Sequence, residues 1–366
     1  MDESSHSDIR SVLFKLHLAG GLGAGLFLLI LGVSGAVLAF SDDIDAFLHP
    51  SIFKVAPHAQ PLPLTQLAAS ASAVLHPGDV IKVYVPSVRP DRSYWFEAFP
   101  GHHRLPRQVF VNQYTGEVLG NLSVVRFTTM MKALHTIPIV MGLSSVFLIF
   151  LAPSGLYLWW PLKRVGINTS ASFRRLSFDL HNSLGFFSSL FLFVFAATGG
   201  YMAFESWTVP LTIAMTHSKP MQRTFVSQPK TDVQPISADL VCSIAKNALS
   251  GASILWVSFP QEPRADYMVK MRFPEDHSDN GGSVVWIDQF SGNTLDVVST
   301  RNASPAERVA NLNRALHTGA IGGGTGRLLA ALASLTLPLQ AITGAWLWWT
   351  KRRSRSGSRT GSTPSC

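Results

Sequence analysis

The sequence contains few charged residues and almost no cysteine. Asp, Glu, Lys and Arg make up 14% of its 366 residues, against roughly 25% in a typical soluble protein. It has two cysteines, and a Cys-x-x-Cys-His motif is absent, which excludes a covalent c-type haem. Walker and His-Glu-x-x-His motifs are also absent, and the glycine runs at 21–25 and 322–326 do not fit Gly-x-Gly-x-x-Gly. The chain therefore carries no recognisable site for a nucleotide electron donor.

Long hydrophobic runs are abundant instead. Four apolar stretches, at about 18–40, 137–160, 182–204 and 326–349, are nearly free of charge. Each is about 23 residues long, or roughly 35 Å of helix, which is enough to cross a ~30 Å hydrocarbon core. We therefore predict four membrane-spanning helices.

Basic residues predict how these helices are oriented, because positive charge favours the cytoplasmic side. They precede the first span, fill the loop between the second and third spans, and follow the last one: Arg10, Lys15, Lys163, Arg164, Arg174, Arg175, Lys351, Arg352, Arg353, Arg355 and Arg359. We expect a multi-pass protein of a bacterial inner membrane with both termini in the cytoplasm. Much of the net charge of +8 is this inner-face clustering, so we expect lipid and not nucleic acid as its partner.

The two halves of the sequence repeat each other. FKLHLAGGLGAGLFLLILGVSGAVLAF (14–40) matches FDLHNSLGFFSSLFLFVFAATGGYMAF (178–204), SGLYLWW matches TGAWLWW, and VFVNQYTGEVL (109–119) matches VVWIDQFSGNTL (284–295). Each external segment reads as one helix followed by a short antiparallel sheet. This repetition predicts a tandem duplication with a pseudo-twofold axis along the membrane normal.

The predicted fold is a four-helix membrane bundle with two periplasmic α+β modules. Its segments are a cytoplasmic N-terminus (1–13), a first span (14–40), a first module (41–136), a second span (137–160), a cytoplasmic loop (161–180), a third span (181–204), a second module (205–325), a fourth span (326–349) and a disordered basic tail (350–366).

Four of the twelve histidines occupy equivalent places in the two copies. His17 and His181 lie at the cytoplasmic ends of the first and third spans, whereas His135 and His317 lie at the external ends of the second and fourth. The predicted axis brings each pair face to face. Two neutral imidazoles that face each other in an apolar bundle suit axial ligation of haem iron. We therefore predict two non-covalent haems b, ligated by His17 with His181 and by His135 with His317.

Glycines and basic residues surround these histidines in both copies. Gly21 and Gly185 lie one helical turn after His17 and His181, and Gly35 and Gly199 lie on the same helix face five turns away. We expect these glycines to leave room for the flat macrocycles. The residues expected to pair with haem propionates are Arg10 and Arg174 at the inner haem, and Lys132 and Arg314 at the outer one.

Other readings of these residues compete with haem ligation. A histidine at a span end is often an interfacial residue or a proton relay, and glycines also allow helices to approach closely. His317 itself ends a predicted surface helix of about 305–317, which begins with a Ser304–Glu307 capping box and Pro305 and is stopped by Gly319.

On the LH motifs, the four-span layout, SGLYLWW and TGAWLWW, and the NQYTGEV and DQFSGNT turns, the chain resembles the PepSY-associated transmembrane helix family over about residues 10–353. This family of bacterial inner-membrane proteins includes a ferrioxamine reductase, a haem b protein that reduces a periplasmic ferric siderophore. Asn112 departs mildly from the typical turn, which has the Asp that Asp288 supplies.

The resemblance implies a haem-dependent ferric-siderophore reductase, with the chelate held between the two external modules and electrons supplied by a cytoplasmic or quinol donor. No protein acid or base is required, so we expect no classical catalytic residue. Arg126, Arg301, Arg308 and Arg327 are candidates to attract an anionic chelate. Two alternatives remain: a non-redox PepSY protein that regulates a peptidase, and a metal or siderophore transporter.

Overall fold

The computed structural model describes residues 3–58, 60–99, 106–122, 126–219, 226–229 and 233–359. The chain forms two compact units. We call them the helical unit (Met1–Phe40, Thr128–Thr208 and Leu316–Cys366) and the sheet unit (Ser41–Phe127 and Val209–Ala315). Each unit thus combines segments from both halves of the sequence.

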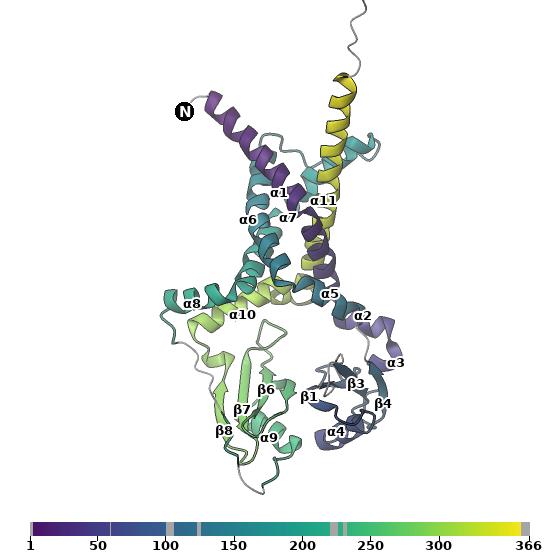
Figure 1. Ribbon diagram of the computed structural model, residues 1–366, viewed down its shortest axis with the longest axis vertical. Helices are drawn as coiled ribbons and strands as arrows, with labels where there is room; N and C mark the ends of the chain where they lie inside the picture. Colours follow the sequence, from purple (N-terminus) through teal and green to yellow (C-terminus); the bar gives the residue numbers. More distant parts are fainter. Residues whose placement is uncertain are drawn as a thin grey trace, which may run out of the picture. The chain divides into compact units, whose positions relative to one another are not determined.

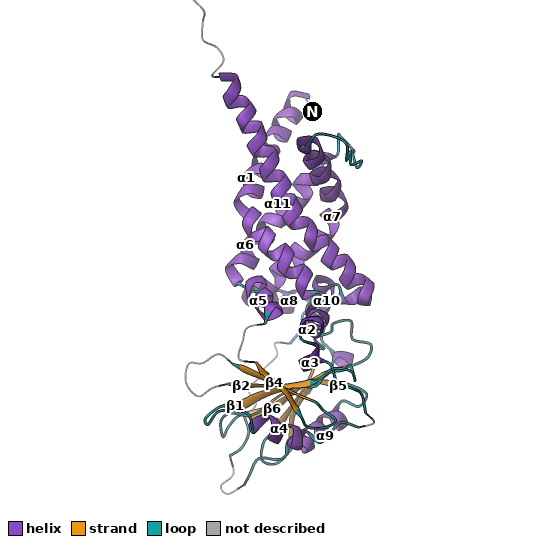
Figure 2. Ribbon diagram, turned by 90° about the vertical axis from the view of Figure 1, so that its right-hand side faces the viewer, coloured by secondary structure: helices purple, strands orange, loops and turns teal. Residues whose placement is uncertain are grey.

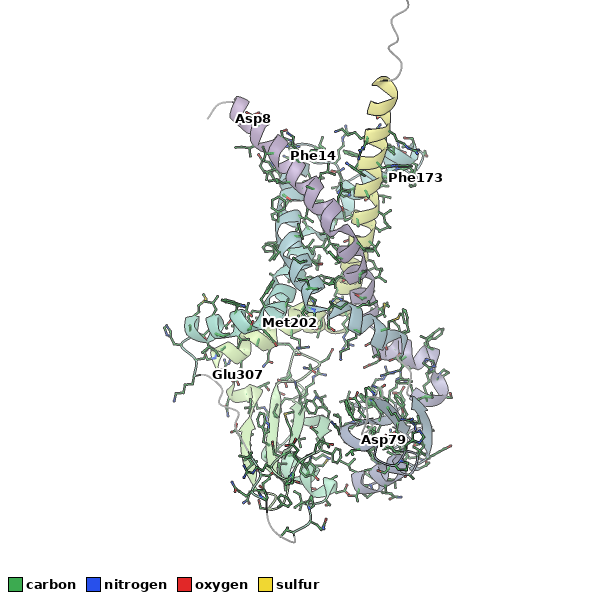
Figure 3. All side chains as sticks on the ribbon, viewed as in Figure 1. Asp8, Phe14, Asp79, Phe173, Met202 and Glu307 are labelled. Atoms are coloured by element: carbon green, nitrogen blue, oxygen red, sulfur yellow. The ribbon has the colours of Figure 1, made fainter. Side chains whose placement is uncertain are left out.

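Four long helices build the helical unit: α1 (Glu3–Leu38), α6 (Pro138–Trp159), α7 (Phe173–Ala203) and α11 (Gly323–Arg359). Each contains a stretch long and apolar enough to cross a membrane. Helices α1 and α7 both pack against α6 and α11 (Figure 1), so α1 and α7 lie on one diagonal of the bundle. Phe14 and Phe173 mark the end of the bundle near which α1 and α7 begin, and Met202 marks the opposite end (Figure 3). Helices α1 and α7 therefore run in the same direction.

The outer surface of the bundle is strongly apolar. Leu26, Ile139 and Leu190 are each about two-thirds exposed, at 66%, 65% and 70%. In water such exposure is unfavourable, whereas acyl chains solvate these side chains well. Inside the bundle, a Cβ added to Gly32 of α1 would lie 2.6 Å from Pro338 of α11, so these two helices approach nearly to backbone contact.

The helices extend beyond the predicted spans at three ends. Helix α1 begins at Glu3, α7 begins at Phe173 inside the predicted 161–180 loop, and α11 continues to Arg359. The prediction of a disordered tail is therefore wrong for 350–359, and 360–366 lie outside the described residues. Lys and Arg are good helix formers, and once a helix is nucleated each further residue adds a hydrogen bond at little entropic cost.

Short helices occur near the span ends: α2 (Ser41–Leu48), α3 (Pro50–Phe53), α5 (Phe127–His135), α8 (Glu205–Met215) and α10 (Pro305–Thr318). The predicted capping box of α10 is confirmed, because the backbone N–H of Ser304 donates to the Glu307 carboxylate and that of Glu307 donates to the Ser304 hydroxyl. Gly319 follows in the left-handed conformation, with φ of 73°. The predicted ends of this helix are therefore confirmed to within one residue.

The sheet unit contains one eight-stranded antiparallel sheet in the order β4-β3-β2-β1-β5-β6-β7-β8 (Figure 2). The first half supplies β1 (Val80–Val85), β2 (Tyr94–Phe99), β3 (Arg107–Val111) and β4 (Val118–Leu122). The second half supplies β5 (Ser253–Ser258), β6 (Asp266–Arg272), β7 (Ser283–Asp288) and β8 (Thr294–Val298). Each half carries a bulge in its first strand, between Ile81 and Val83 and between Ile254 and Trp256.

The two predicted α+β modules are not separate bodies. Strands β1 and β5 pair directly, with Val83 opposite Ser258 and Tyr84 opposite Val257, so the gap in which a chelate was expected is closed along this edge. Pairing gives the exposed edge strand of each half a partner for its unpaired backbone groups. The predicted helices are α4 (Leu64–Ser72) and α9 (Ala238–Ala248), and residues of both belong to one buried core with both halves of the sheet.

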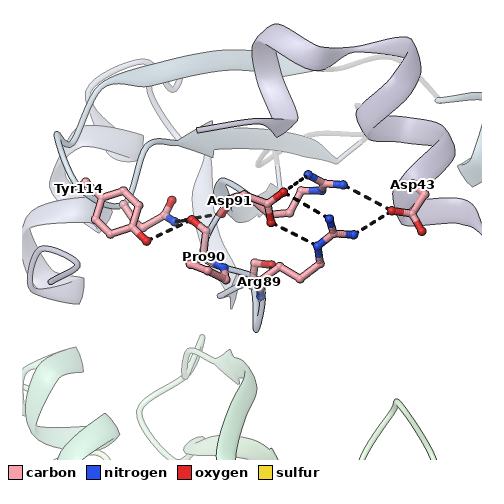
Figure 4. Close-up of polar contacts among 8 residues, drawn as sticks. Asp43, Arg89, Pro90, Asp91 and Tyr114 are labelled. Atoms are coloured by element: carbon pink, nitrogen blue, oxygen red, sulfur yellow. Dashed lines mark hydrogen bonds and ion pairs between the residues drawn. The ribbon is translucent and has the colours of Figure 1, made fainter. Parts of the chain in front are cut away.

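Charged side chains connect separate segments of the sheet unit. Asp239 of α9 accepts hydrogen bonds from the first backbone N–H groups of α4, at 2.6 Å from Leu64 and 3.1 Å from Thr65. Figure 4 shows the Arg89 guanidinium between Asp43 of α2 and Asp91, at 2.8 and 3.2 Å. Because Arg89 is half exposed, these pairs position α2 more than they stabilise the fold.

Candidate cofactor site

Four histidines point into the helical unit, and each is held by a hydroxyl group on a neighbouring helix. The four Nδ1–oxygen distances are nearly equal: 2.9 Å from His17 to Ser154, 3.0 Å from His135 to Ser34, 3.0 Å from His181 to Thr343 and 2.9 Å from His317 to Thr198. In every case the histidine and its hydroxyl belong to the same half of the sequence. The same contact is thus made four times, twice in each half.

A glycine follows each of these hydroxyl residues. The four hydroxyl–glycine pairs are Ser34–Gly35, Ser154–Gly155, Thr198–Gly199 and Thr343–Gly344. A Cβ added to any of these glycines would lie only 3.1–3.2 Å from the Cε1 atom of the histidine bound next to it. Each imidazole therefore lies against bare helix backbone, with Nδ1 turned to the hydroxyl.

His135 and His317, one of the two predicted pairs, lie close together across the bundle. The rings of His135 and His317 have their centres 6.2 Å apart and their planes inclined by 60°. His17 and His181 lie on the diagonal helices α1 and α7, each near the end at which its helix begins. Burial lowers the pKa of His135, so this imidazole is neutral at pH 7 and has a lone pair to offer a metal.

This donor set fits haem iron better than a bare metal ion. Two imidazoles bound to one metal atom at about 2.0 Å each have ring centres roughly 6 Å apart, which matches the His135–His317 separation. Among the described residues no cluster of three or more His, Cys, Asp or Glu side chains is present. A bare ion usually takes three or four protein ligands, whereas a porphyrin supplies four nitrogens and leaves two axial positions for histidine.

The glycines predicted to make room for a macrocycle have different neighbours. Gly21 faces open space, with no atom within 4 Å of an added Cβ, but Gly185 faces the Gln340 amide at 3.2 Å. Gly35 and Gly199 contact the His135 and His317 rings. Gly35 and Gly199 therefore make room for the histidine rings, because each glycine is next to the hydroxyl residue that binds the ring.

The basic residues predicted to pair with propionates lie at the ends of the helices. The Arg10 guanidinium donates to the carbonyl of Leu158 at 2.6 Å. Arg174, Lys132 and Arg314 are exposed. Pairing of these four residues with haem propionates therefore stays a prediction.

Three of the arginines considered for an anionic chelate have intramolecular partners. Arg126 pairs with the buried Asp45 at 2.6 Å and stacks over Phe53 and Phe110. Arg301 pairs with Glu275 at 2.7 Å, and Arg308 donates to the Ala303 carbonyl. The charges of Arg126 and Arg301 are thus paired with carboxylates, and attraction of an anionic chelate by these arginines stays a prediction.

Sequence reasoning missed the hydroxyls and two of the four glycines. Gly155 and Gly344 lie in SGLYLWW and TGAWLWW, which indicated repetition and the family resemblance but not a contact with histidine. The missed signal is a Ser-Gly or Thr-Gly dipeptide that occurs once within each of the four predicted apolar stretches.

The family model of the PepSY-associated TM region matches residues 14–351 of the chain. A search of curated proteins found no match. The matched region contains all four histidines and all four hydroxyl–glycine pairs as well as the sheet unit. Because the match covers most of the sequence, the chain belongs to the PepSY-associated TM region family.

Proposed function

We propose that this chain is a dihaem b electron-transfer protein of the bacterial inner membrane, which reduces a ferric siderophore in the periplasm. The observation that supports the proposal is the 6.2 Å separation of the His135 and His317 rings, one from each half. His17 and His181, near the other end of the bundle, make the same hydroxyl contacts. When bound, two haems would supply one-electron carriers on either side of the bilayer. The tandem duplication proposed from the sequence accounts for this arrangement, since one ancestral half would offer one ligand to each site.

The residues between the two histidine pairs favour electron transfer over ion passage. His17 and Ser34, which binds His135, are seventeen positions apart on α1, a rise of roughly 25 Å. An apolar cluster fills this interval, with Ala24 and Leu28 of α1 packed against Leu148, Leu151, Leu192, Ala196 and Leu337. The buried polar side chains of the four apolar stretches are hydroxyls such as Ser188, and these stretches contain no Asp or Glu, which counts against a metal transporter.

The chemistry at the acceptor needs little from the protein. Iron(III) is held by the hard oxygen ligands of a siderophore, and one-electron reduction to iron(II) weakens those bonds. No proton transfer by a side chain is required, so the proposal includes no acid or base. The electron donor is proposed to be a cytoplasmic reductant or a membrane quinol.

The direct test is an absorbance spectrum of the full chain purified in detergent. We expect a reducible b-type Soret band and about two haems per chain. His17→Ala and His181→Ala should each remove one haem, and His135→Ala and His317→Ala the other. His76→Ala, at an exposed position in the sheet unit, is the matched control and should keep both.

Two results would overturn the proposal. A folded, colourless protein would favour the non-redox reading of a PepSY protein that regulates a peptidase. Loss of the same haem from His17→Ala and His135→Ala would show that the pairing of ligands is wrong. Reduction of ferrioxamine by the chemically reduced protein then tests the acceptor separately.

A further inference from the structure

The hydroxyl in each hydroxyl–glycine pair donates a hydrogen bond to a backbone carbonyl of its own helix. Ser34 donates to the Ile30 carbonyl at 2.7 Å, Thr198 to Val194 and Thr343 to Leu339 at 2.6 Å each, and Ser154 to Leu151 at 3.2 Å. A hydroxyl has one proton and two lone pairs. Toward the histidine it can therefore only accept, and the proton in that hydrogen bond belongs to the imidazole.

This assignment fixes the tautomer of all four rings. If Nδ1 carries the proton, the lone pair of a neutral imidazole is on Nε2. Turning the ring over would replace Nδ1 by a carbon atom and lose the hydrogen bond to the hydroxyl. Both nitrogens thus have a set role before any ligand arrives.

We infer that Ser34, Ser154, Thr198 and Thr343 are positioning residues, which hold each histidine with Nε2 free for iron and strengthen it as a ligand by accepting its Nδ1 proton. The inference rests on the proposed haem function. Hydrogen-bond partners behind a metal-bound histidine typically contribute 10- to 100-fold to affinity. An acceptor on Nδ1 also makes the imidazole a stronger electron donor, which favours iron(III) and lowers the midpoint potential.

The two sites are built with the same chemistry but not with identical residues. Each pair combines a serine from the first half with a threonine from the second: Ser154 with Thr343, and Ser34 with Thr198. Because serine and threonine offer the same acceptor oxygen, exchange of one for the other should leave haem binding unchanged. A substitution that removes this oxygen should weaken it.

The test compares Thr343→Val with Thr343→Ser in the full chain. Valine keeps the shape of threonine and loses the acceptor, whereas serine keeps the acceptor. We expect Thr343→Val to weaken haem binding at the His17–His181 site about 10- to 100-fold and to raise the midpoint potential of that haem alone. Thr343→Ser should match the unmodified protein in both measurements.

A glycine variant tests the other half of the pair. Gly344→Ala should displace the His181 ring, since its new methyl group would lie 3.2 Å from Cε1, and the same haem should be lost. Gly23→Ala is the control, because no atom lies within 4 Å of its added Cβ. Unchanged binding and potential in Thr343→Val would overturn the inference.

A readout that needs no haem separates this inference from the proposed function. Nitrogen-15 NMR of histidine-labelled protein without haem distinguishes protonated from unprotonated ring nitrogens. We expect Nδ1 to be protonated in the unmodified chain and in Thr343→Ser, and a mixture of tautomers at His181 in Thr343→Val. If the chain proves colourless, the proposed function fails, and this spectrum still decides the tautomer.

Discussion

Asp288 is a buried carboxylate that the structure keeps charged. It is the last residue of β7, where the turn of the second half begins. Its carboxylate accepts hydrogen bonds from the backbone N–H groups of Gln228, Phe290 and Ser291 and from the Ser291 hydroxyl. Burial raises the pKa of Asp288, but these hydrogen bonds outweigh it and lower the pKa to about 2. The carboxylate thus orders the turn and the segment that contains Gln228.

The lowered pKa predicts acid sensitivity of the sheet unit. In the unfolded chain this carboxyl titrates near 3.9, so its contribution is complete above about pH 4 and is lost as the pH falls toward 2. Asp288→Asn should cost about 1–3 kcal/mol of unfolding free energy at pH 7, and less at pH 3. Calorimetric unfolding of the purified full chain at both pH values measures this.

The first half provides the control for this variant. Asn112 occupies the equivalent turn and accepts one hydrogen bond, from the Tyr114 backbone at 2.9 Å. Asn112→Asp should change stability little, because a carboxylate accepts that bond equally well. A loss in Asp288→Asn that is the same at pH 3 as at pH 7 would contradict the assignment of the low pKa.

At the residue scale, repetition in the sequence indicated which histidines matter but not which atoms they touch. His17 and His181 stand out because they recur at equivalent positions with a glycine in common. Ser154 and Gly155 contact His17 from another helix, and the rotation of that helix about its axis is set by packing. For the same reason Gly35 was assigned to a macrocycle, although its neighbour is the His135 ring.

Helix α10 depends on the glycine that ends it. Gly319 has φ of 73°, and a Cβ there would lie 2.5 Å from the Gly326 carbonyl of α11. This close approach joins α10 to the start of α11. It also fixes the last turn of α10, which contains His317.

Gly319→Ala should therefore disturb the His135–His317 site without touching either ring. A left-handed alanine costs roughly 1–2 kcal/mol, and the contact with Gly326 forces the two helices apart. We expect loss of one haem with the other retained, measured by haem content and by the spectrum of the remaining Soret band. Gly322→Ala, where an added Cβ meets no atom within 4 Å, should keep both haems.

At the element scale, the sequence predicted most helices and strands but not how the sheets join. The one helix predicted in each external segment and the strand–turn–strand units at 109–119 and 284–295 all form. These elements could be predicted because the spacing of apolar residues within a short stretch indicates a helix or a strand. The pairing of β1 with β5 links residues far apart in sequence, and a strand pattern does not reveal which edge is free.

The whole molecule has an asymmetric charge distribution that predicts its orientation. Basic residues cluster at one end of the bundle, around the start of α1, the 160–175 segment and the end of α11. The apolar spans between them contain almost no charge. Positive clusters of this kind stay in the cytoplasm, which would put the sheet unit and the His135–His317 site in the periplasm.

The native cysteines allow this orientation to be measured. Cys242 in the sheet unit reacts slowly, because burial raises the pKa of its thiol to about 11, so Cys242→Ser with Ser250→Cys moves a reporter to an exposed position nearby. We expect a membrane-impermeant maleimide to label Cys at 250 in intact spheroplasts and to label Cys366 only after lysis. A chain with both native cysteines replaced by serine gives the background. Labelling of Cys366 in intact spheroplasts would show that the predicted orientation is wrong. The sheet unit and the His135–His317 site would then face the cytoplasm, where a periplasmic chelate could not reach them.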